Sequence, residues 1–464
     1  MSSLPIHYLK CDKTQFRDFQ KSCSQQLQVN SSQIYQPYYS LFFNIHNTKH
    51  SHCLFDIQRR FQVLKINSIK DDFFHNSNTI VNATIYDRLH QVNFTQPLFC
   101  KCIPLLDPLS YLMNHYNTQV KRNPLLPSAY NYNTFDKIND IDNMAYIDTF
   151  FSYIASELTL QNKLPSFPIF YGSMNGIKEE FKYDITDDYT RFENKSWFYK
   201  DRGKSFSVNL YISSDEEDEE PESGDYIAIL KSFPCQHLFI EPLEGTIEDF
   251  LKDKENVNIP LLQSCFFQTA FALAYLQKHF DFTHNDLHIN NIMYQSTDKS
   301  YIYYKFNNMY FKVPTHGYLF KIIDFGRSIF TFHKKQYFND SFKKHGEAGG
   351  QYDLPYDKLL FPLKENIVKP NFHFDLCRLS ITILDELDYS NNKESSNPFF
   401  QYLYSLTYDE SNQSLYELYD DFDLYISIAK YANQALPRDC IQHSMFQEYR
   451  IPKKQFPKKL YYSL

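Results

Sequence analysis

Two short segments carry the polar residues whose types and spacing could do chemistry. Residues 284–293 read HNDLHINNIM, and residues 321–326 read KIIDFG. Phosphoryl transfer needs a carboxylate near the attacking hydroxyl and oxygen ligands for magnesium on a triphosphate. Asp286 fits the first need, and Asn291 and Asp324 fit the second. A capped aspartate turn beside an apolar strand would explain either segment alone, but their occurrence together and in this order favours one catalytic site.

The composition indicates a folded protein with a large core. Of the 464 residues, 43% are hydrophobic and 18% aromatic, which is enough apolar surface for two or three domain-sized cores. The net charge of −8 argues against broad nucleic-acid binding through the overall electrostatic field. No apolar run approaches the ~20 residues of a membrane span, and residues 1–10 lack the apolar core of a secretory signal. We therefore expect no transmembrane segment and no specific nucleic-acid partner.

The nine cysteines are scattered and odd in number. Only Cys100 and Cys102 lie close together in the sequence, and no second pair lies nearby, so we do not expect a zinc site. Reduced thiols in an intracellular compartment are the simplest interpretation, and we expect a cytoplasmic location.

Apolar periodicity predicts the elements that must position the polar residues. Residues 143–160 have apolar side chains at helical intervals and should form an amphipathic helix. Strands of the first half are expected at residues 61–66, 80–86, 97–103, 167–172, 226–230 and 237–240. A short turn is expected between the last two of these strands.

The second half of the chain is predicted to be mostly helical. Asn258 can cap a long apolar helix that has Pro260 in its first turn and leads directly into residues 284–293. Two aromatic strands around an Asn-Asn turn predict a hairpin over about 300–314. A later buried helix is expected at 374–387.

Two segments show no clean periodicity. Residues 1–60 mix polar and aromatic residues and are expected to form an N-terminal extension of unclear structure. Residues 213–222 are almost entirely acidic, and because like charges repel we expect a disordered surface loop at about 212–224. Ser213 and Ser214 could be targets of an acidophilic kinase, but a solvated insertion is the favoured interpretation.

Taken together, these motifs resemble the protein-kinase superfamily, and more narrowly the serine/threonine kinases of large nucleocytoplasmic DNA viruses. The resemblance covers about residues 80–390 and implies an α+β, bilobal fold with ATP and Mg²⁺ as cofactors between the lobes. A small, mainly β N-lobe with one key helix would occupy 61–240, and a larger, mainly helical C-lobe with a C-terminal extension would occupy 241–464. The runs that carry the resemblance are KCIPLLDP at 101–108, THNDLHINNIMY at 283–294, FKVP at 311–314 and KIIDFGR at 321–327.

The resemblance also implies roles for individual residues of the second half. Asp286 would accept or orient the proton of the substrate hydroxyl. Asn291 and Asp324 would hold magnesium. Asp375, at the start of the later predicted helix, matches the buried aspartate that braces the catalytic loop.

In the first half, Lys101 matches the lysine that contacts the nucleotide phosphates from the third strand of the small lobe. A lysine in an apolar strand needs an acidic partner, because a lone buried ammonium group is costly. Glu157 stands where the pairing glutamate of the family falls, and Asp148 is its competitor. The two carboxylates are nine residues apart and lie roughly opposite each other on a helix, so both cannot face Lys101. Glu157 is the favoured partner.

The remaining implied contacts are with the nucleotide. Ile240, Glu241 and Leu243 fall at the connection between the lobes, where backbone groups would meet adenine. Ala83 falls at the last of three positions where the family has glycines that let backbone amides approach the phosphates.

The chain also departs from the family pattern. No glycine occurs before Gly172, and Asn78 and Ile80 stand at the other two glycine positions, so the phosphates are held weakly or by a different loop. Asn285 replaces the arginine that usually pairs with a phosphate on the activation segment. His288 replaces the lysine of protein-serine kinases, and no A-P-E motif is visible.

Three functions therefore remain open. The first, which the intact D-F-G motif favours, is a protein kinase that phosphorylates serine or threonine on a protein substrate. The second is a small-molecule kinase of the aminoglycoside or choline kinase type, which the D-L-H sequence also fits. The third is a pseudokinase that binds partners without catalysis. The sequence determines neither the substrate nor the oligomeric state.

Overall fold

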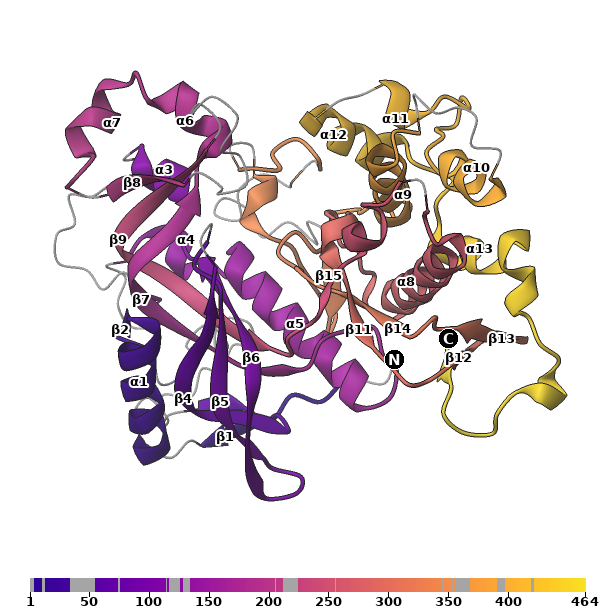
Figure 1. Cartoon of the computed structure of the whole chain (residues 1–464), viewed down its shortest axis with the longest axis horizontal. Helices are drawn as coiled ribbons and strands as arrows, with labels where there is room; N and C mark the ends of the chain where they lie inside the picture. The colour runs from indigo at the N-terminus through magenta and orange to yellow at the C-terminus, as the bar shows by residue number, and fades with distance from the viewer. Residues whose placement is uncertain are drawn as a thin grey trace. The chain divides into compact units, whose positions relative to one another are not determined.

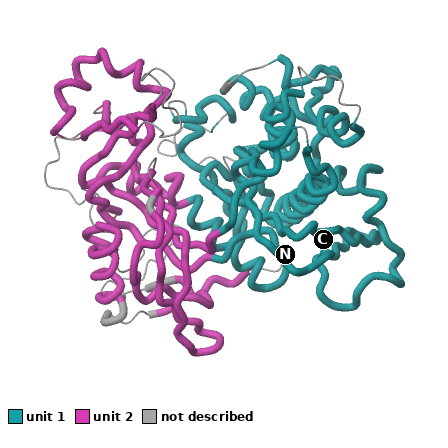
Figure 2. Tube along the Cα trace, in the orientation of Figure 1, with its two compact units in different colours: residues 1–3, 147–169, 243–464 teal, residues 4–146, 170–242 magenta. Residues whose placement is uncertain are grey.

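The computed structural model describes residues 4–10, 13–33, 55–73, 76–113, 115–116, 126–127, 134–204, 206–211, 224–254, 256–343, 346–352, 354, 368–389, 397–418 and 421–464. The chain has a mixed α+β fold and divides into two compact units (Figure 2). Unit 2 contains residues 4–146 and 170–242, and unit 1 contains residues 147–169 and 243–464. The predicted acidic loop at about 212–224 lies almost wholly outside the described residues.

An antiparallel seven-stranded sheet forms the centre of unit 2 (Figure 1). Its order is β2-β7-β9-β6-β5-β4, and β8 pairs with β9 from outside this path. The strands are β2 (Val29–Asn30), β4 (Phe61–Asp72), β5 (Thr79–Asp87), β6 (Val92–Pro104), β7 (Phe170–Asp184), β8 (Phe206–Tyr211) and β9 (Asp225–Ile240).

The strands predicted at 61–66, 80–86 and 97–103 are confirmed as β4, β5 and β6. In β5, burial alternates residue by residue along the whole strand, because successive side chains point to opposite faces of a sheet. The observed strands are longer than predicted because polar residues at their ends still pair with neighbours, as Asp72 does with Thr79.

The predicted turn between residues 230 and 237 is wrong. One strand, β9, runs through this region from Asp225 to Ile240 and pairs with β7 on both sides of Ser232. Ser232 has a positive φ of 52°, and its pairing with β7 is missing there. A local irregularity at Ser232 therefore accommodates the polar and proline residues of this segment, and the strand continues because β7 pairs with it on both sides.

The other elements of unit 2 surround this sheet. α1 (Lys13–Leu27) packs on β4, so the described part of the expected N-terminal extension contributes to the fold of this unit. The remaining elements are β1 (Tyr8–Lys10), β3 (Phe55–Ile57), α3 (Pro108–Leu112), α4 (Asp136–Asn139), α6 (Thr186–Phe192) and α7 (Ser196–Asp201).

The predicted amphipathic helix is α5 (Met144–Leu160), which begins in unit 2 and continues in unit 1 from Ile147. The chain passes from unit 2 to unit 1 again after Pro242. This second crossing falls where the connection between lobes was expected, but kinase-like lobes with the limits 61–240 and 241–464 stay a prediction.

The long helix α8 (Ile259–Phe280) forms the core of unit 1. Asn258 caps it by accepting a hydrogen bond from the N–H of Leu261 (3.2 Å), and Pro260 lies in its first turn, as predicted. By length and composition alone α8 could cross a membrane, so the apolar run is longer than expected. However, 83% of its apolar window is buried inside the protein, which is typical of a core helix.

A three-stranded sheet of unit 1, β10-β11-β14, combines one strand that precedes α8 in the chain with two strands that follow it. It consists of β10 (Gly245–Thr246), β11 (Ile292–Ser296) and β14 (Tyr318–Ile322). The hairpin expected at about 300–314 is formed by β12 (Tyr301–Phe306) and β13 (Met309–Pro314), which pair antiparallel around the Asn-Asn turn.

The later predicted helix is α9 (Phe374–Glu386), whose inner face is buried. Further helices complete unit 1: α10 (Pro398–Ser405), α11 (Leu415–Leu418), α12 (Asp421–Tyr431) and α13 (Pro437–Gln442). Short helical turns and strands are η2 (Ile247–Phe250), η3 (Ile289–Asn291), β15 (Phe330–Phe332), β16 (Lys335–Tyr337), η4 (Asp340–Phe342), η5 (Ser444–Tyr449), η6 (Lys453–Gln455) and β17 (Tyr462–Ser463).

Candidate active site

The loop that contains Asp286 follows α8 and is held by a buried carboxylate. Asp375, in the first turn of α9, accepts hydrogen bonds from the backbone N–H groups of His284 (2.9 and 3.1 Å) and Asn285 (2.9 Å). Burial raises the pKa of Asp375, while His284 and the two backbone donors oppose this rise. Asp375 thus braces the loop that contains Asp286, as predicted, whereas the catalytic role of this loop stays a prediction.

Asn285, at the position of the usual arginine, ties the catalytic loop to the segment after the D-F-G motif. Its backbone is left-handed, with a φ of 63°, a conformation that asparagine tolerates better than most residues. Its Nδ2 donates to the Oγ1 of Thr283 and to the carbonyl oxygen of Arg327, both at 3.0 Å. Its Oδ1 accepts from the hydroxyl of Tyr352 at 2.6 Å. A neutral amide thus makes contacts that need no phosphate.

Asp286 is partly exposed, and two side chains contact one of its carboxylate oxygens. The hydroxyl of Tyr425 donates to Oδ1 over 2.9 Å, and Nη1 of Arg327 lies 3.5 Å from the same oxygen. The backbone carbonyl of Asp286 accepts from Nδ2 of Asn291 at 2.8 Å. Two donors therefore hold one oxygen of the predicted catalytic carboxylate, which remains within reach of solvent.

The amide nitrogen of Asn291 has two close partners, the carbonyl oxygen of Asp286 and the ring of His288. Its Nδ2 donates to the carbonyl of Asp286 and lies 3.0 Å from Nε2 of His288, while the backbone N–H of Asn290 faces Nδ1 of His288 at 3.3 Å. A neutral imidazole can accept one of these two donors, and a protonated imidazole can accept neither. Burial lowers the pKa of His288, which favours the neutral ring. With Nδ2 committed, Oδ1 of Asn291 is the atom left for a cation.

Asp324 follows β14 by two residues and lies close to Asn291 through the pairing of β14 with β11. The N–H of Ile323 donates to the carbonyl of Asn291 at 3.1 Å. Asp324 has a φ of 62°, which residues with a side chain rarely adopt, and its Oδ1 accepts from the N–H of Gly326 at 3.4 Å. The two predicted magnesium ligands thus lie at the ends of neighbouring strands.

These two residues fit a magnesium site that phosphate and water complete, rather than a metal site formed by protein ligands alone. The described part of the chain contains no group of three or more His, Cys, Asp or Glu side chains that could hold a metal ion. Magnesium usually takes one or two protein carboxylates and completes its shell with phosphate oxygens and water. The amide oxygen of Asn291 and the carboxylate of Asp324 match that donor set.

The two candidate partners of Lys101 have different surroundings on α5. Asp148 is buried, and its Oδ1 accepts from the N–H of Phe325, in the D-F-G motif, at 2.9 Å. Glu157 accepts a hydrogen bond from Gln161 at 3.3 Å, and burial raises its pKa. Asp148 therefore has a structural link to the catalytic motif that the sequence did not reveal. The pairing of Lys101 with Glu157 stays a prediction.

Of the other predicted nucleotide contacts, all but Leu243 belong to unit 2. Lys101 lies in β6 opposite Leu238 of β9, and Ala83 is buried in the middle of β5. Ile240 is the last residue of β9, and Glu241 follows it directly. Leu243 is the first residue of unit 1 after the crossing. The contacts of these residues with a nucleotide stay predictions.

The turn between β4 and β5 stands where a glycine-rich loop would lie, and two hydrogen bonds close its described part, residues 73 and 76–78. The N–H of Asn78 donates to Oδ1 of Asn76 (2.9 Å), and the N–H of Phe73 donates to the carbonyl of Asn78 (3.4 Å). Oδ1 of Asn78 accepts from the N–H of Cys102, which places the turn beside the Lys101 end of β6. Two backbone amides of this turn therefore donate within the protein.

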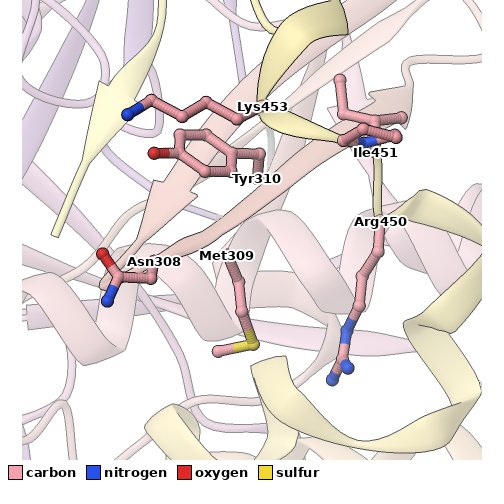
Figure 3. A pocket seen from close by; sticks show the side chains of 7 residues that line it. Asn308, Met309, Tyr310, Arg450, Ile451 and Lys453 are labelled. Carbon is pink, nitrogen blue, oxygen red and sulfur yellow. The ribbon is translucent and has the colours of Figure 1, made fainter.

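A pocket of about 520 Å³ lies elsewhere in unit 1, at the turn of the β12–β13 hairpin (Figure 3). No residue of the catalytic loop lines it. Its lining residues are Asn308, Met309, Tyr310, Arg450, Ile451, Pro452 and Lys453. We assign it no part in the predicted chemistry.

Sequence analysis gave no role to Tyr425 or Arg327. Arg327 follows the D-F-G motif directly, so its position was the one signal that could have indicated a contact with the catalytic loop. Tyr425 lies 139 residues from Asp286, and no local pattern distinguishes it among the 38 tyrosines of the chain.

Comparison with known proteins supports a kinase-like relationship over part of the chain. No family model matches the sequence. A probable serine/threonine-protein kinase of Dictyostelium discoideum is 35% identical over 112 residues, which make up 22% of this chain and 9% of that protein. The match thus spans about a tenth of the length of this relative. The narrower resemblance to viral kinases finds no support in these comparisons.

Proposed function

We propose that this chain is an ATP- and Mg²⁺-dependent phosphotransferase whose acceptor is a serine or threonine hydroxyl of a protein. One observation carries the proposal. Asp286, Asn291 and Asp324 meet around one loop whose backbone is fixed by the buried Asp375. The partial similarity to a probable serine/threonine-protein kinase supports a protein acceptor.

In the proposed reaction, the acceptor oxygen forms a bond to the γ-phosphorus while the bond from this phosphorus to the β–γ bridging oxygen breaks. The hydroxyl proton passes to the carboxylate of Asp286, and ADP leaves with the bridging oxygen. Asn291 and Asp324 would hold Mg²⁺, which neutralises charge on the phosphate oxygens when bound. Lys101 keeps its predicted role at the phosphates.

The hydrogen bonds of the amides of Phe73 and Asn78 support a modified grip on the phosphates, because amides that donate within the turn are not available to a ligand. We also propose a reducing, intracellular location. The seven cysteines among the described residues are all free and buried, which supports this proposal.

The test uses the purified full chain with radiolabelled ATP and Mg²⁺. One arm offers a library of Ser/Thr peptides, and a second arm offers aminoglycosides, choline and other small alcohols. Transfer to peptides that chelation of Mg²⁺ abolishes is the expected result. Transfer to small alcohols alone would favour the small-molecule kinase. Nucleotide binding without any transfer would favour the pseudokinase.

A further inference from the structure

The closest side-chain contact of the predicted catalytic carboxylate comes from a distant helix. Tyr425, on α12, donates its hydroxyl hydrogen to Oδ1 of Asp286 over 2.9 Å. Its ring lies against Phe374 on α9 (6.1 Å between centroids) and stacks on Phe422 (5.9 Å). The phenol is therefore fixed by aromatic neighbours, and its hydroxyl group is aimed at the carboxylate.

Two arginines add positive charge around this contact. The guanidinium group of Arg378, on α9, lies 4.7 Å from the centre of the Tyr425 ring, and that of Arg327 lies 5.8 Å from it. Arg327 also approaches Oδ1 of Asp286 at 3.5 Å, where both side chains are about one-fifth exposed (22% and 23%). Burial and the charge of Asp286 raise the pKa of Tyr425, so the phenol keeps its proton and acts as a donor.

Both donors contact the same oxygen of the carboxylate. A carboxylate whose Oδ1 is held by two donors has a fixed rotation, and its Oδ2 is the oxygen that can meet a substrate hydroxyl. Catalytic groups need such fixation, because a small error in the placement of a reacting group costs rate.

We propose that Tyr425 is a positioning residue, which holds Oδ1 of Asp286 so that Oδ2 faces the acceptor hydroxyl. This inference rests on the proposed phosphotransferase function. The opposite role would be a blocking one, in which the phenol occupies the place of the acceptor hydroxyl. The aromatic contacts with Phe374 and Phe422 argue against a side chain that must leave at each turnover.

The decisive variant is Tyr425→Phe, because phenylalanine keeps the ring and removes only the donor. We expect kcat to fall about tenfold, which corresponds to ~1.4 kcal/mol in the barrier, while KM for ATP stays within about twofold. A merely structural role would not separate kcat from KM in this way. The matched control is Tyr416→Phe, which removes another tyrosine–aspartate hydrogen bond in unit 1, from Tyr416 to Asp385 (3.3 Å). Its kcat should equal that of the unchanged protein.

The outcomes separate this inference from the proposed function. An active chain whose Tyr425→Phe variant matches the Tyr416→Phe variant would overturn the positioning role, and a higher kcat would replace it with the blocking role. No transfer by the unchanged chain would overturn the proposed function and, with it, the positioning role.

A second measurement tests the contact without any activity. Melting temperatures are measured for the unchanged chain, Tyr425→Phe, Asp286→Ala and the double variant. If the hydrogen bond exists, the shift caused by Tyr425→Phe should shrink at least about twofold in the Asp286→Ala background, because its partner is already gone. Equal shifts in both backgrounds would show that Tyr425 and Asp286 do not interact, which would overturn the inference even for an active enzyme.

Discussion

The catalytic loop and the β4–β5 turn are both short and polar, yet their hydrogen bonds serve different ends. In the catalytic loop, backbone donors bind the buried Asp375, and the carboxylate of Asp286 remains partly exposed. In the turn, the amides of Phe73 and Asn78 donate to groups of the turn itself. The difference agrees with the proposed function, in which the catalytic loop keeps the groups for phosphoryl transfer and the phosphates are held in a modified way.

The largest effect should come from the catalytic loop. Asp286→Ala is expected to lower kcat by about 10³-fold, because it removes the group that receives the hydroxyl proton. Nucleotide affinity should change little, because Asn291 and Asp324 remain. The measurement is single-turnover transfer beside ATP binding by calorimetry. Retention of most activity would remove Asp286 from the mechanism and break the comparison.

Lys101 tests whether unit 2 supplies a phosphate contact in spite of its closed turn. Lys101→Met is expected to lower kcat by about 10²-fold, a usual loss for a charge that stabilises a transition state.

The acidic partner of Lys101 is identified by comparing the activities of Glu157→Gln and Asp148→Asn. Both changes remove charge but keep an oxygen acceptor, so Asp148→Asn can still bind the N–H of Phe325. We expect Glu157→Gln to cause a smaller loss than Lys101→Met. A larger loss for Asp148→Asn than for Glu157→Gln would assign the pairing to Asp148.

A pH profile tests how the catalytic loop orients Asn291. The pKa of His288 lies below its usual 6.5, so the neutral ring dominates above that pH and can accept one hydrogen bond, from the N–H of Asn290 or from Nδ2 of Asn291. Protonation removes the acceptor. The contribution of His288 to stability should therefore decline as the pH falls below 6.5, and kcat should fall around the lowered pKa of the folded protein. The decline is complete once the pH has fallen through the lowered pKa. In His288→Gln, kcat at neutral pH should be lower than that of the unchanged protein, and kcat should no longer fall near the pKa of His288. If kcat of His288→Gln still fell at acidic pH as it does in the unchanged protein, this role of His288 would be contradicted.

A smaller effect is expected in the turn. Asn76→Ala removes the acceptor that binds the N–H of Asn78, which frees this amide for a phosphate oxygen. One hydrogen bond is worth about 0.5–1.5 kcal/mol, so KM for ATP should fall about two- to twelvefold with kcat unchanged. A rise in KM would show that the present closed turn serves nucleotide binding as it stands.

The smallest effect is expected from phosphorylation after the D-F-G motif. Asn285 already binds this segment through Arg327 and Tyr352, and Ser328 and Ser341 are buried. Phosphatase-treated and untreated protein should therefore have the same specific activity. A tenfold loss on treatment, restored by rephosphorylation within residues 327–370, would show that a phosphate orders the segment. Part of this range lies outside the described residues.

Local patterns predicted much of the fold because they depend on local physics. The cap at Asn258, the helix α5 and the alternation of β5 follow from backbone donors and from the periodicity of apolar side chains. The same local reasoning failed at β9. A serine and a proline indicated a turn there, but continuous pairing with β7 overrode that signal.

The sequence by itself determined which groups are predicted to react, because Asp286, Asn291 and Asp324 stand at characteristic positions in two short runs. It also predicted Asp375 as the brace. Only the tertiary structure decided what surrounds these groups. Tyr425 reaches Asp286, and Asp148 reaches Phe325, across 139 and 177 residues, and each contact depends on how whole helices pack rather than on neighbouring residues. A carboxylate can be recognised from a motif, whereas its orientation is set by donors that only folding brings near.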